Sequence, residues 1–295
     1  MNANRRVDHV VLPARDLEAQ SAFYSRLGFQ VGARNIHPWG TENRLVQFDG
    51  SFLELITMGD AATPPEFAPR QFSFGTHVRD WLRMHGDGMS MLACDSGDAN
   101  ADAAWFKQAG IADCAPFHFG RQGKRPDGSE MEVAFTLAYT TPSSMPDLCF
   151  FTCQQHNPEN FWNPANQRHQ NTAKGVERVV VVHDRPVETV GFLKGYIGGS
   201  PVFDQHHGLS LATKKGAVAV MTPEGARAIF GDDPALFDGR RARFAAIVFE
   251  VENLAITELT LRTNNVPHRR EERQIIVPSG AAFGVLLAFQ EKAKP

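Results

Sequence analysis

The sequence lacks several features that would assign it to a familiar class of protein. No stretch approaches the roughly 18 apolar residues that a membrane-spanning helix requires, and the polar segment 1–6 has no apolar core of a secretory leader. The formal net charge of −3 provides no basic field to hold a nucleic acid backbone. We therefore expect a cytoplasmic protein without a membrane or nucleic acid partner.

Cysteine is scarce as well, since the 295 residues contain only four. Cys149 and Cys153 are close in sequence, but no second pair exists to complete a zinc cluster. Buried free thiols in a reducing compartment are the expected state. The chain also has no phosphate-binding loop and no Gly-x-Ser-x-Gly element, so the signatures of P-loop proteins and of serine hydrolases are excluded.

What the chain does contain is a short unit of one strand, one helix and three more strands. The elements expected in the first unit are a strand at 7–12, a helix from the cap Asp16 to Gly28, and strands at 30–34, 44–48 and 52–56. Asp49-Gly50 between the last two strands is a strong hairpin signal. The unit therefore has the order βαβββ.

This order recurs three more times along the chain. The four units lie at about 5–58, 88–156, 175–222 and 243–290. The third matches the first most closely, because one shift lays Val7 on Val176 and Phe23 on Phe192. In the second unit a hairpin is expected at 126–128, where the sequence reads Pro-Asp-Gly.

One such unit cannot bury both its helix and the concave face of its sheet, so the units are expected to pair. Two units side by side form a curved eight-stranded sheet with a cleft inside it. The predicted fold is α+β, with four βαβββ modules paired into two domains. The boundaries expected are an N-terminal domain at 1–156, a polar linker at 157–174 and a C-terminal domain at 175–295.

Several motifs resemble the vicinal-oxygen-chelate superfamily, which includes glyoxalases, extradiol ring-cleavage dioxygenases and drug-sequestering resistance proteins. Val-Asp-His-Val-Val at 7–11, Gly-Phe at 28–29 and Phe-Leu-Glu-Leu-Ile at 52–56 look like its first module. The segments 37–43 and 153–169 are similar to segments of its glyoxalase-like branch. The resemblance implies that the two domains are glyoxalase/dioxygenase-like.

The superfamily further implies a divalent metal held by the first and last strands of paired modules. His9 is at the first-strand position and Glu54 at the last-strand position of the first module. An imidazole and a carboxylate together suit zinc, iron, manganese or nickel. A metal with open positions can chelate two adjacent substrate oxygens. His9 and Glu54 are therefore the candidate catalytic residues and the first candidate metal ligands.

The other modules do not repeat this pair. The expected equivalents of His9 are Met91, Arg178 and about Ala246, and those of Glu54 are Cys153 or Gln154 in the second module and Ala219, Met221 or Leu287 beyond it. We expect His156 to complete the metal site, with Cys153, Gln155 and His169 as weaker candidates. The alternative left open is a metal-free His9–Glu54 pair that acts as acid and base.

Further residues are candidates for binding a ligand at the mouth of the cleft. They are His37, Trp39, Thr41, Asn43, Phe119, Arg121, Gln155, His156 and Trp162. The guanidinium of Arg121 matches the geometry of a substrate carboxylate, although a surface salt bridge is an equal alternative. The aromatic segment 158–162 is read either as a lid over the cleft or as an anchor of the linker.

Two functions remain in competition at this point. The first is a metal-dependent lyase, isomerase or dioxygenase that acts on a substrate with adjacent oxygens, such as a 2-oxo compound, a hydroxy acid or a catechol. The second is a metal-free protein of the drug-resistance type that sequesters a small apolar ligand, which the 22 phenylalanines favour. We expect the C-terminal pair of modules to pack against the N-terminal pair, to cover the substrate or to form a homodimer.

Overall fold

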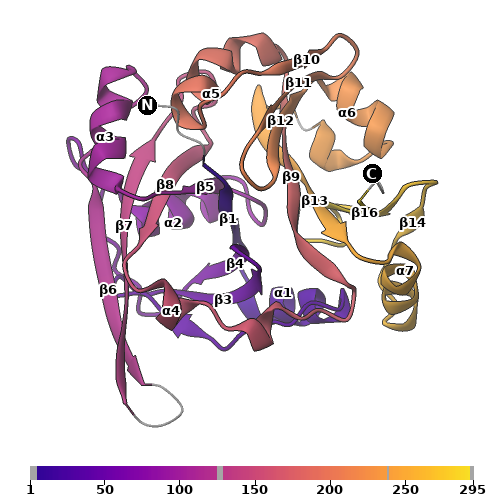
Figure 1. Ribbon diagram of the computed structural model, residues 1–295, viewed down its shortest axis with the longest axis horizontal. Helices are drawn as coiled ribbons and strands as arrows, with labels where there is room; N and C mark the ends of the chain where they lie inside the picture. The colour runs from indigo at the N-terminus through magenta and orange to yellow at the C-terminus, as the bar shows by residue number, and fades with distance from the viewer. Residues whose placement is uncertain (1–4, 125–128, 238, 293–295) are drawn as a thin grey trace.

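The computed structural model describes residues 5–124, 129–237 and 239–292. The hairpin expected at 126–128 lies outside these residues. The chain forms two eight-stranded sheets, each curved and accompanied by helices (Figure 1). The expected α+β fold of four βαβββ modules in two pairs is confirmed.

The N-terminal sheet has the strand order β2-β3-β4-β1-β5-β8-β7-β6. Its strands are β1 (Val7–Pro13), β2 (Asn35–Ile36), β3 (Thr41–Phe48), β4 (Ser51–Met58), β5 (Met91–Asp95), β6 (Phe117–Lys124), β7 (Glu130–Thr140) and β8 (Cys149–Gln155). The two modules meet where β1 pairs antiparallel with β5. The first strand of each module also pairs in parallel with the last one, β1 with β4 and β5 with β8.

The C-terminal sheet repeats this topology in the order β10-β11-β12-β9-β13-β16-β15-β14. Its strands are β9 (Ala173–His183), β10 (Val202–Asp204), β11 (Gly208–Ala212), β12 (Ala217–Met221), β13 (Ala242–Val251), β14 (Arg269–Arg270), β15 (Gln274–Val277) and β16 (Leu286–Glu291). Between the two sheets the chain forms α4 (Pro158–Phe161) and a 3-10 turn at Pro164–Gln167.

The helix that follows the first strand of each module begins where a side chain caps it. Asp16 caps α1 (Leu17–Arg26) and Asp98 caps α3 (Ala99–Gln108), as predicted. The corresponding helices of the second sheet are α5 (Val190–Tyr196) and α7 (Leu254–Thr263). The expected strand at 30–34 is wrong, because regular pairing with β3 starts only at Asn35, opposite Asn43.

Two helices were not anticipated from the module pattern. α2 (Phe74–Met84) follows β4, and α6 (Pro223–Phe230) follows β12. Each packs its apolar residues against the concave face of its own sheet. In the C-terminal half, Phe230 of α6 and the nearby Leu236 are buried among strand side chains that include Ala219 and Ala288, so this cleft is filled.

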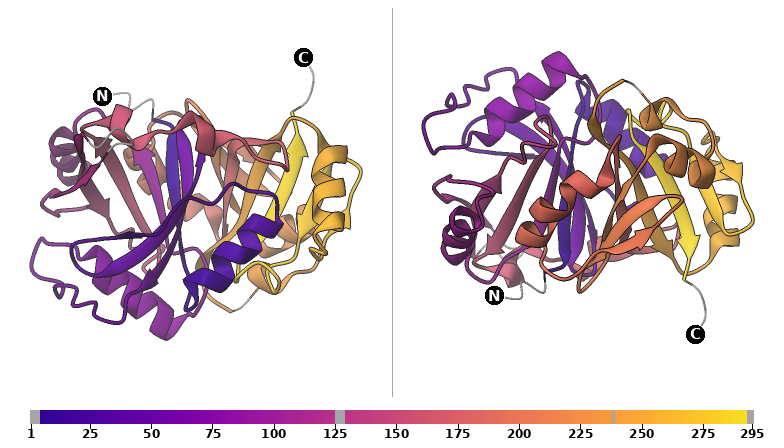
Figure 2. Two further views of the ribbon diagram at one scale, coloured as in Figure 1. Left: turned by 90° about the horizontal axis from the view of Figure 1, so that it is seen from below. Right: turned by 90° about the horizontal axis from the view of Figure 1, so that it is seen from above.

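The two sheets pack together through the faces opposite their clefts, and Figure 2 shows them side by side. Val10 of β1 and Val179 of β9 belong to one continuous apolar core. Aromatic pairs join the halves within it: the ring centroids of Phe150 and Phe244 are 5.2 Å apart. None of the described helices is long and apolar enough to cross a membrane.

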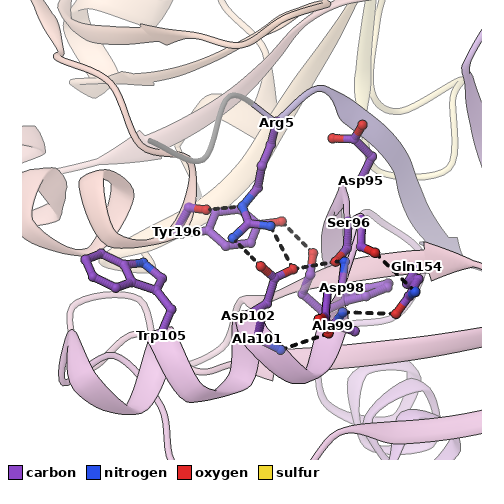
Figure 3. A network of polar contacts seen from close by, with 12 residues as sticks. Arg5, Asp95, Ser96, Asp98, Ala99, Ala101, Asp102, Trp105, Gln154 and Tyr196 are labelled. Carbon is purple, nitrogen blue, oxygen red and sulfur yellow. Dashed lines mark hydrogen bonds and ion pairs between the residues drawn. The ribbon is translucent and has the colours of Figure 1, made fainter. Parts of the chain in front are cut away.

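A polar network fastens the N-terminal segment to both halves (Figure 3). The guanidinium of Arg5 donates two hydrogen bonds of 2.8 Å to the carboxylate of Asp102 in α3, and its Nε donates to the carbonyl of Tyr196 in α5. The hydroxyl of Tyr196 contacts the carbonyls of Leu92 and Phe151, on the central strands β5 and β8. The junction therefore reaches the strands that carry the N-terminal cleft.

Candidate functional site

The concave face of the N-terminal sheet contains a small, partly open cavity. Most of its wall is aromatic or aliphatic, and it is closed on two sides by the start of α2 and by α4. Its lining residues are His9, His37, Trp39, Asn43, Leu45, Phe52, Glu54, Phe74, Phe119, Arg121, Phe135, Leu137, Phe151, Cys153 and Phe161. An apolar cavity with few convergent polar groups is the usual form of a small-molecule site.

Glu54 of β4 is the acidic group of this cavity, and its side chain is almost fully buried. The neighbouring strand β3 supplies Asn43, whose Nδ2 donates a hydrogen bond of 2.6 Å to Glu54 Oε1. The Nε2 atom of His37 lies 3.7 Å from the same oxygen. One carboxylate oxygen is thus held in place by side chains from two other segments.

His37 is fixed on its other side by the buried residue Thr41, whose Oγ1 lies 2.9 Å from His37 Nδ1. Its ring stacks on Trp39 with centroids 4.8 Å apart. Burial lowers the pKa of His37, although the Glu54 carboxylate raises it. Burial prevails, so the imidazole is neutral at pH 7 and offers one donor and one acceptor.

Arg121 of β6 brings a permanent positive charge to the same cavity. Burial lowers the pKa of the Arg121 guanidinium, whereas the Glu54 carboxylate raises it. Its Nη1 donates a hydrogen bond of 2.6 Å to Asn35 Oδ1, and Asn35 Nδ2 donates to Asn43 Oδ1. A chain of polar contacts therefore leads from Arg121 through the two asparagines to Glu54.

His9 lies on the floor of the cavity, stacked on Phe52 at 4.2 Å and edge-on to Phe151 at 5.2 Å. Its Nδ1 atom is 2.8 Å from Oδ2 of the fully buried Asp8. Adjacent residues of a strand normally face opposite sides. Here β1 has a bulge, because Val7 pairs with Cys94 while His9 pairs with the adjacent, preceding residue of β5, Ala93. The extra residue is Asp8, and a bulge re-aims a side chain in this way.

The metal positions implied by the superfamily do not fit this chain. Val11 lies opposite Glu54, and its counterpart Ala93 lies opposite Phe151. The second-module equivalent of Glu54 is therefore Phe151, and the expectation of Cys153 or Gln154 is wrong. With Met91 at the equivalent of His9, two of the four positions carry no ordinary ligand.

A different group of side chains does approach metal-ligand geometry. Asp8, His9 and Cys153 are buried and offer ligand atoms that all lie within 4.8 Å of one another. Within the described residues, no other group of three such side chains meets this criterion, and Glu54 belongs to none. Burial raises the pKa of the Cys153 thiol well above its usual value, and the Asp8 and Glu54 carboxylates add to this effect.

His156, expected to complete the ligand set, lies elsewhere. Its Nε2 atom is 2.7 Å from Thr136 Oγ1, and its ring is 5.3 Å from that of His118. The cavity is instead lined by Phe119 of β6, Phe135 of β7 and Cys153 of β8, because successive strand residues alternate between the two faces of the sheet. His156 therefore points away from His9.

The remaining candidates are divided between the cavity and its surroundings. Gln155 contacts Asp8 through a hydrogen bond of 3.2 Å from Nε2 to Oδ1. Trp162 packs against Phe161 and Phe52 and is not among the lining residues. Both ring nitrogens of His169 are engaged by backbone groups, outside the cavity.

Two parts of the site were not recognised in the sequence. Asp8 was passed over because a regular strand would turn it away from His9. Helix α2 was missed, although Ser73 before an apolar pattern is a readable cap signal. Phe161 belongs to the aromatic segment that was expected either as a lid or as an anchor of the linker. It lines the cavity, and its carbonyl accepts a hydrogen bond of 2.9 Å from Gln47 Nε2.

Comparison with known proteins agrees with this fold. Residues 7–197 match the family model of a glyoxalase-like domain. No curated protein sequence matches the chain. Among solved structures, the chain is similar to a hypothetical protein from Staphylococcus aureus, with 12% identity and a TM-score of 0.67 over 98% of this chain and 100% of that one.

A second similar structure is a mutant of 4-hydroxymandelate synthase from Streptomyces coelicolor. The identity is 12% and the TM-score 0.61, with 98% of this chain and 93% of that chain covered. At such identity the likeness concerns the fold alone. It shows that the same overall fold extends over both halves of the chain.

Proposed function

This chain belongs to the glyoxalase-like domain family, and on that basis we propose that it is an enzyme acting on a small molecule with two adjacent oxygen atoms. The substrate would bind in the N-terminal cavity. The observation that carries the proposal is the convergence of Glu54, His37 and Arg121 on one apolar cavity.

These groups suit a 2-oxo or 2-hydroxy compound. The planar guanidinium of Arg121 can donate two parallel hydrogen bonds to neighbouring oxygens. The neutral imidazole of His37 can donate to or accept from the same group. The aromatic wall formed by Trp39, Phe119 and Phe135 excludes water, which strengthens each of these polar contacts.

The reaction we propose is proton transfer at the carbon next to a carbonyl group. Glu54 takes the proton from this carbon, and the C–H electron pair moves into the carbonyl to form an enolate. Arg121 stabilises the negative charge on the enolate oxygen. Return of the proton to the same carbon regenerates the substrate with exchange of that hydrogen. Where the carbon also carries a hydroxyl group, the hydroxyl proton moves to the former carbonyl oxygen while Glu54 protonates the former carbonyl carbon, which completes an isomerisation without any oxidant. Asn43 acts here as a positioning residue for the Glu54 carboxylate.

Solvent exchange provides the test. The protein is incubated in D₂O with hydroxyacetone or 2-oxobutanoate, and loss of the C–H proton signal is followed by NMR. The wild type is expected to accelerate exchange, and Glu54→Gln to slow it by roughly a hundredfold or more. Glu18→Gln, on the exposed side of α1, is the matched control and keeps the full rate. Equal rates in the wild type and Glu54→Gln would refute the role of Glu54.

The second candidate function is sequestration of a small aromatic molecule without turnover. It is favoured by Met91 and Phe151 at the positions where the superfamily carries ligands, and by the aromatic lining. In that case the wild type and Glu54→Gln bind an aromatic ligand equally, and neither accelerates exchange. The same two proteins therefore distinguish the two functions.

A further inference from the structure

Three buried polar side chains at the floor of the cavity have no part in the proposed proton transfer. Asp8, His9 and Cys153 offer an oxygen, a nitrogen and a sulfur ligand within 4.8 Å of one another. All three side chains are buried, with Asp8 fully enclosed. Such a set is not needed for packing, because apolar residues would fill the same space without a desolvation cost.

A second observation at the same place concerns Gln155. Its Nε2 donates to Asp8 Oδ1, but its Oε1 is buried and has no hydrogen-bond partner. An amide oxygen enclosed without a donor costs about 1–3 kcal/mol. A cation, or a water bound to one, would satisfy this oxygen beside the Asp8 carboxylate.

The backbone is also shaped for this arrangement. The bulge of β1 places Asp8 and His9 together, and β5 separates β1 from β8, which carries Cys153 and Gln155. Bulges of this kind are common next to functional sites because they re-aim a side chain. The four residues thus come from the bulged β1 and from β8, two strands that are not adjacent in the sheet.

From these observations we propose that Asp8, His9 and Cys153 bind one divalent cation at the floor of the cavity, with Gln155 facing it. A mixed oxygen, nitrogen and sulfur set selects borderline metals such as zinc, cobalt, nickel or ferrous iron over magnesium and calcium. This site differs from the one that the superfamily implies, because it omits Glu54 and uses two residues outside the superfamily positions.

This metal site extends the proposed function, and its role in substrate binding depends on that function. A cation bound to His9 lies next to the cavity that Glu54 also lines. It would coordinate the two adjacent substrate oxygens, and Glu54 would act as the base. When bound, the cation would act as a Lewis acid toward a carbonyl oxygen.

Cobalt titration tests this inference without any substrate. Protein freed of metal by a chelator is titrated with Co²⁺ and followed by near-ultraviolet absorption. We expect one equivalent to bind and to produce a thiolate-to-cobalt charge-transfer band. Cys153→Ser is expected to lose the band, and Asp8→Asn to weaken binding by about tenfold or more. Cys149→Ala, a buried cysteine of the same strand, keeps both.

Glu54→Gln separates this site from the superfamily positions, since it is expected to keep the band and the affinity. A band lost in Glu54→Gln but retained in Cys153→Ser would overturn the proposal, and so would the absence of saturable uptake. Folding of each variant is followed by thermal denaturation with and without Zn²⁺. Zinc is expected to raise the Tm of the wild type and of Glu54→Gln, but not that of Cys153→Ser.

The two proposals can fail separately. If cobalt does not bind but the Glu54-dependent exchange persists, the metal site is wrong and the enzyme proposal stands. If cobalt binds through Cys153 but no probe exchanges, the metal site stands and the reaction is wrong.

Discussion

Asp8 and His9 are neighbours in the sequence, and their side chains are nevertheless joined by a contact of 2.8 Å between Oδ2 and Nδ1. In a regular strand the two would face opposite sides of the sheet. The bulge of β1 brings both within reach of Cys153 on β8. This one irregularity places an oxygen, a nitrogen and a sulfur ligand together at the floor of the cavity.

Asn43 is predicted to control the base through its hydrogen bond to Glu54. In Asn43→Asp two carboxylates face each other, and repulsion keeps one of them protonated near neutral pH. We expect the exchange rate of Asn43→Asp to be at least about tenfold lower at pH 7 and to recover at higher pH. Asn43→Ala removes the donor without adding charge, so its rate falls with a smaller upward shift of the pH profile than in Asn43→Asp. Identical pH profiles for the two variants would contradict this role.

Arg121 is predicted to select substrates that carry a carboxylate. Arg121→Lys keeps a charge but loses the guanidinium fork. We expect binding of 2-oxobutanoate, measured by calorimetry, to weaken by roughly tenfold in Arg121→Lys and further in Arg121→Met. Binding of the uncharged hydroxyacetone should change less. An equal loss of affinity for the two compounds would show that Arg121 supports the cavity wall and does not bind the ligand carboxylate.

His169 is predicted to make folding stability depend on pH. Burial lowers the pKa of His169 to about 4, although its hydrogen bond to the Gln47 carbonyl acts in the opposite direction. The unfolded imidazole has a pKa of about 6.5. Between these values the unfolded chain binds a proton that the folded chain excludes. The contribution of His169 is therefore complete above pH 6.5 and is lost as the pH falls toward 4.

The size of this effect is about 1–2 kcal/mol after allowance for the partial exposure of the ring. His169→Gln retains one donor and one acceptor and does not titrate. Urea unfolding of both proteins at pH 7.5 and pH 5 measures the difference. The free energy of unfolding should fall less between these pH values in His169→Gln than in the wild type. An unchanged pH dependence would mean that other groups cause it.

The Arg5–Asp102 ion pair is predicted to stabilise the junction between the two halves (Figure 3). Both side chains are largely buried, so removal of one partner leaves an uncompensated charge. We expect Asp102→Leu to lower the free energy of unfolding by about 3–5 kcal/mol. The double variant Arg5→Met with Asp102→Leu should recover part of this loss. If Asp102→Leu unfolds at the same urea concentration as the wild type, the pair contributes nothing.

The site was only partly predictable, and single residues show why. Glu54, Asn43 and His37 were recognised because their motifs resemble a family that places such residues around a cleft, and Arg121 because its guanidinium matches the geometry of a carboxylate. His156 was misplaced because one residue of register reverses the face of a strand. His156 follows Cys153 by three positions, and its side chain consequently points to the opposite side of the sheet.

The sequence by itself determined the local elements and their repetition. Alternating apolar residues and caps such as Asp16 and Asp98 define strands and helices through contacts only a few residues apart. That information is sufficient for four modules and for their pairing into two curved sheets. It also identified His9 and Glu54 as side chains of one cleft.

Only the tertiary structure decided which polar groups meet. Asp8 joins Cys153 because a bulge and the order β1-β5-β8 bring two distant segments together. The C-terminal cleft is filled because α6 packs its Phe230 into it, whereas α2 leaves a cavity beside Phe74. These outcomes depend on contacts between residues far apart in the chain, and local sequence patterns do not specify such contacts.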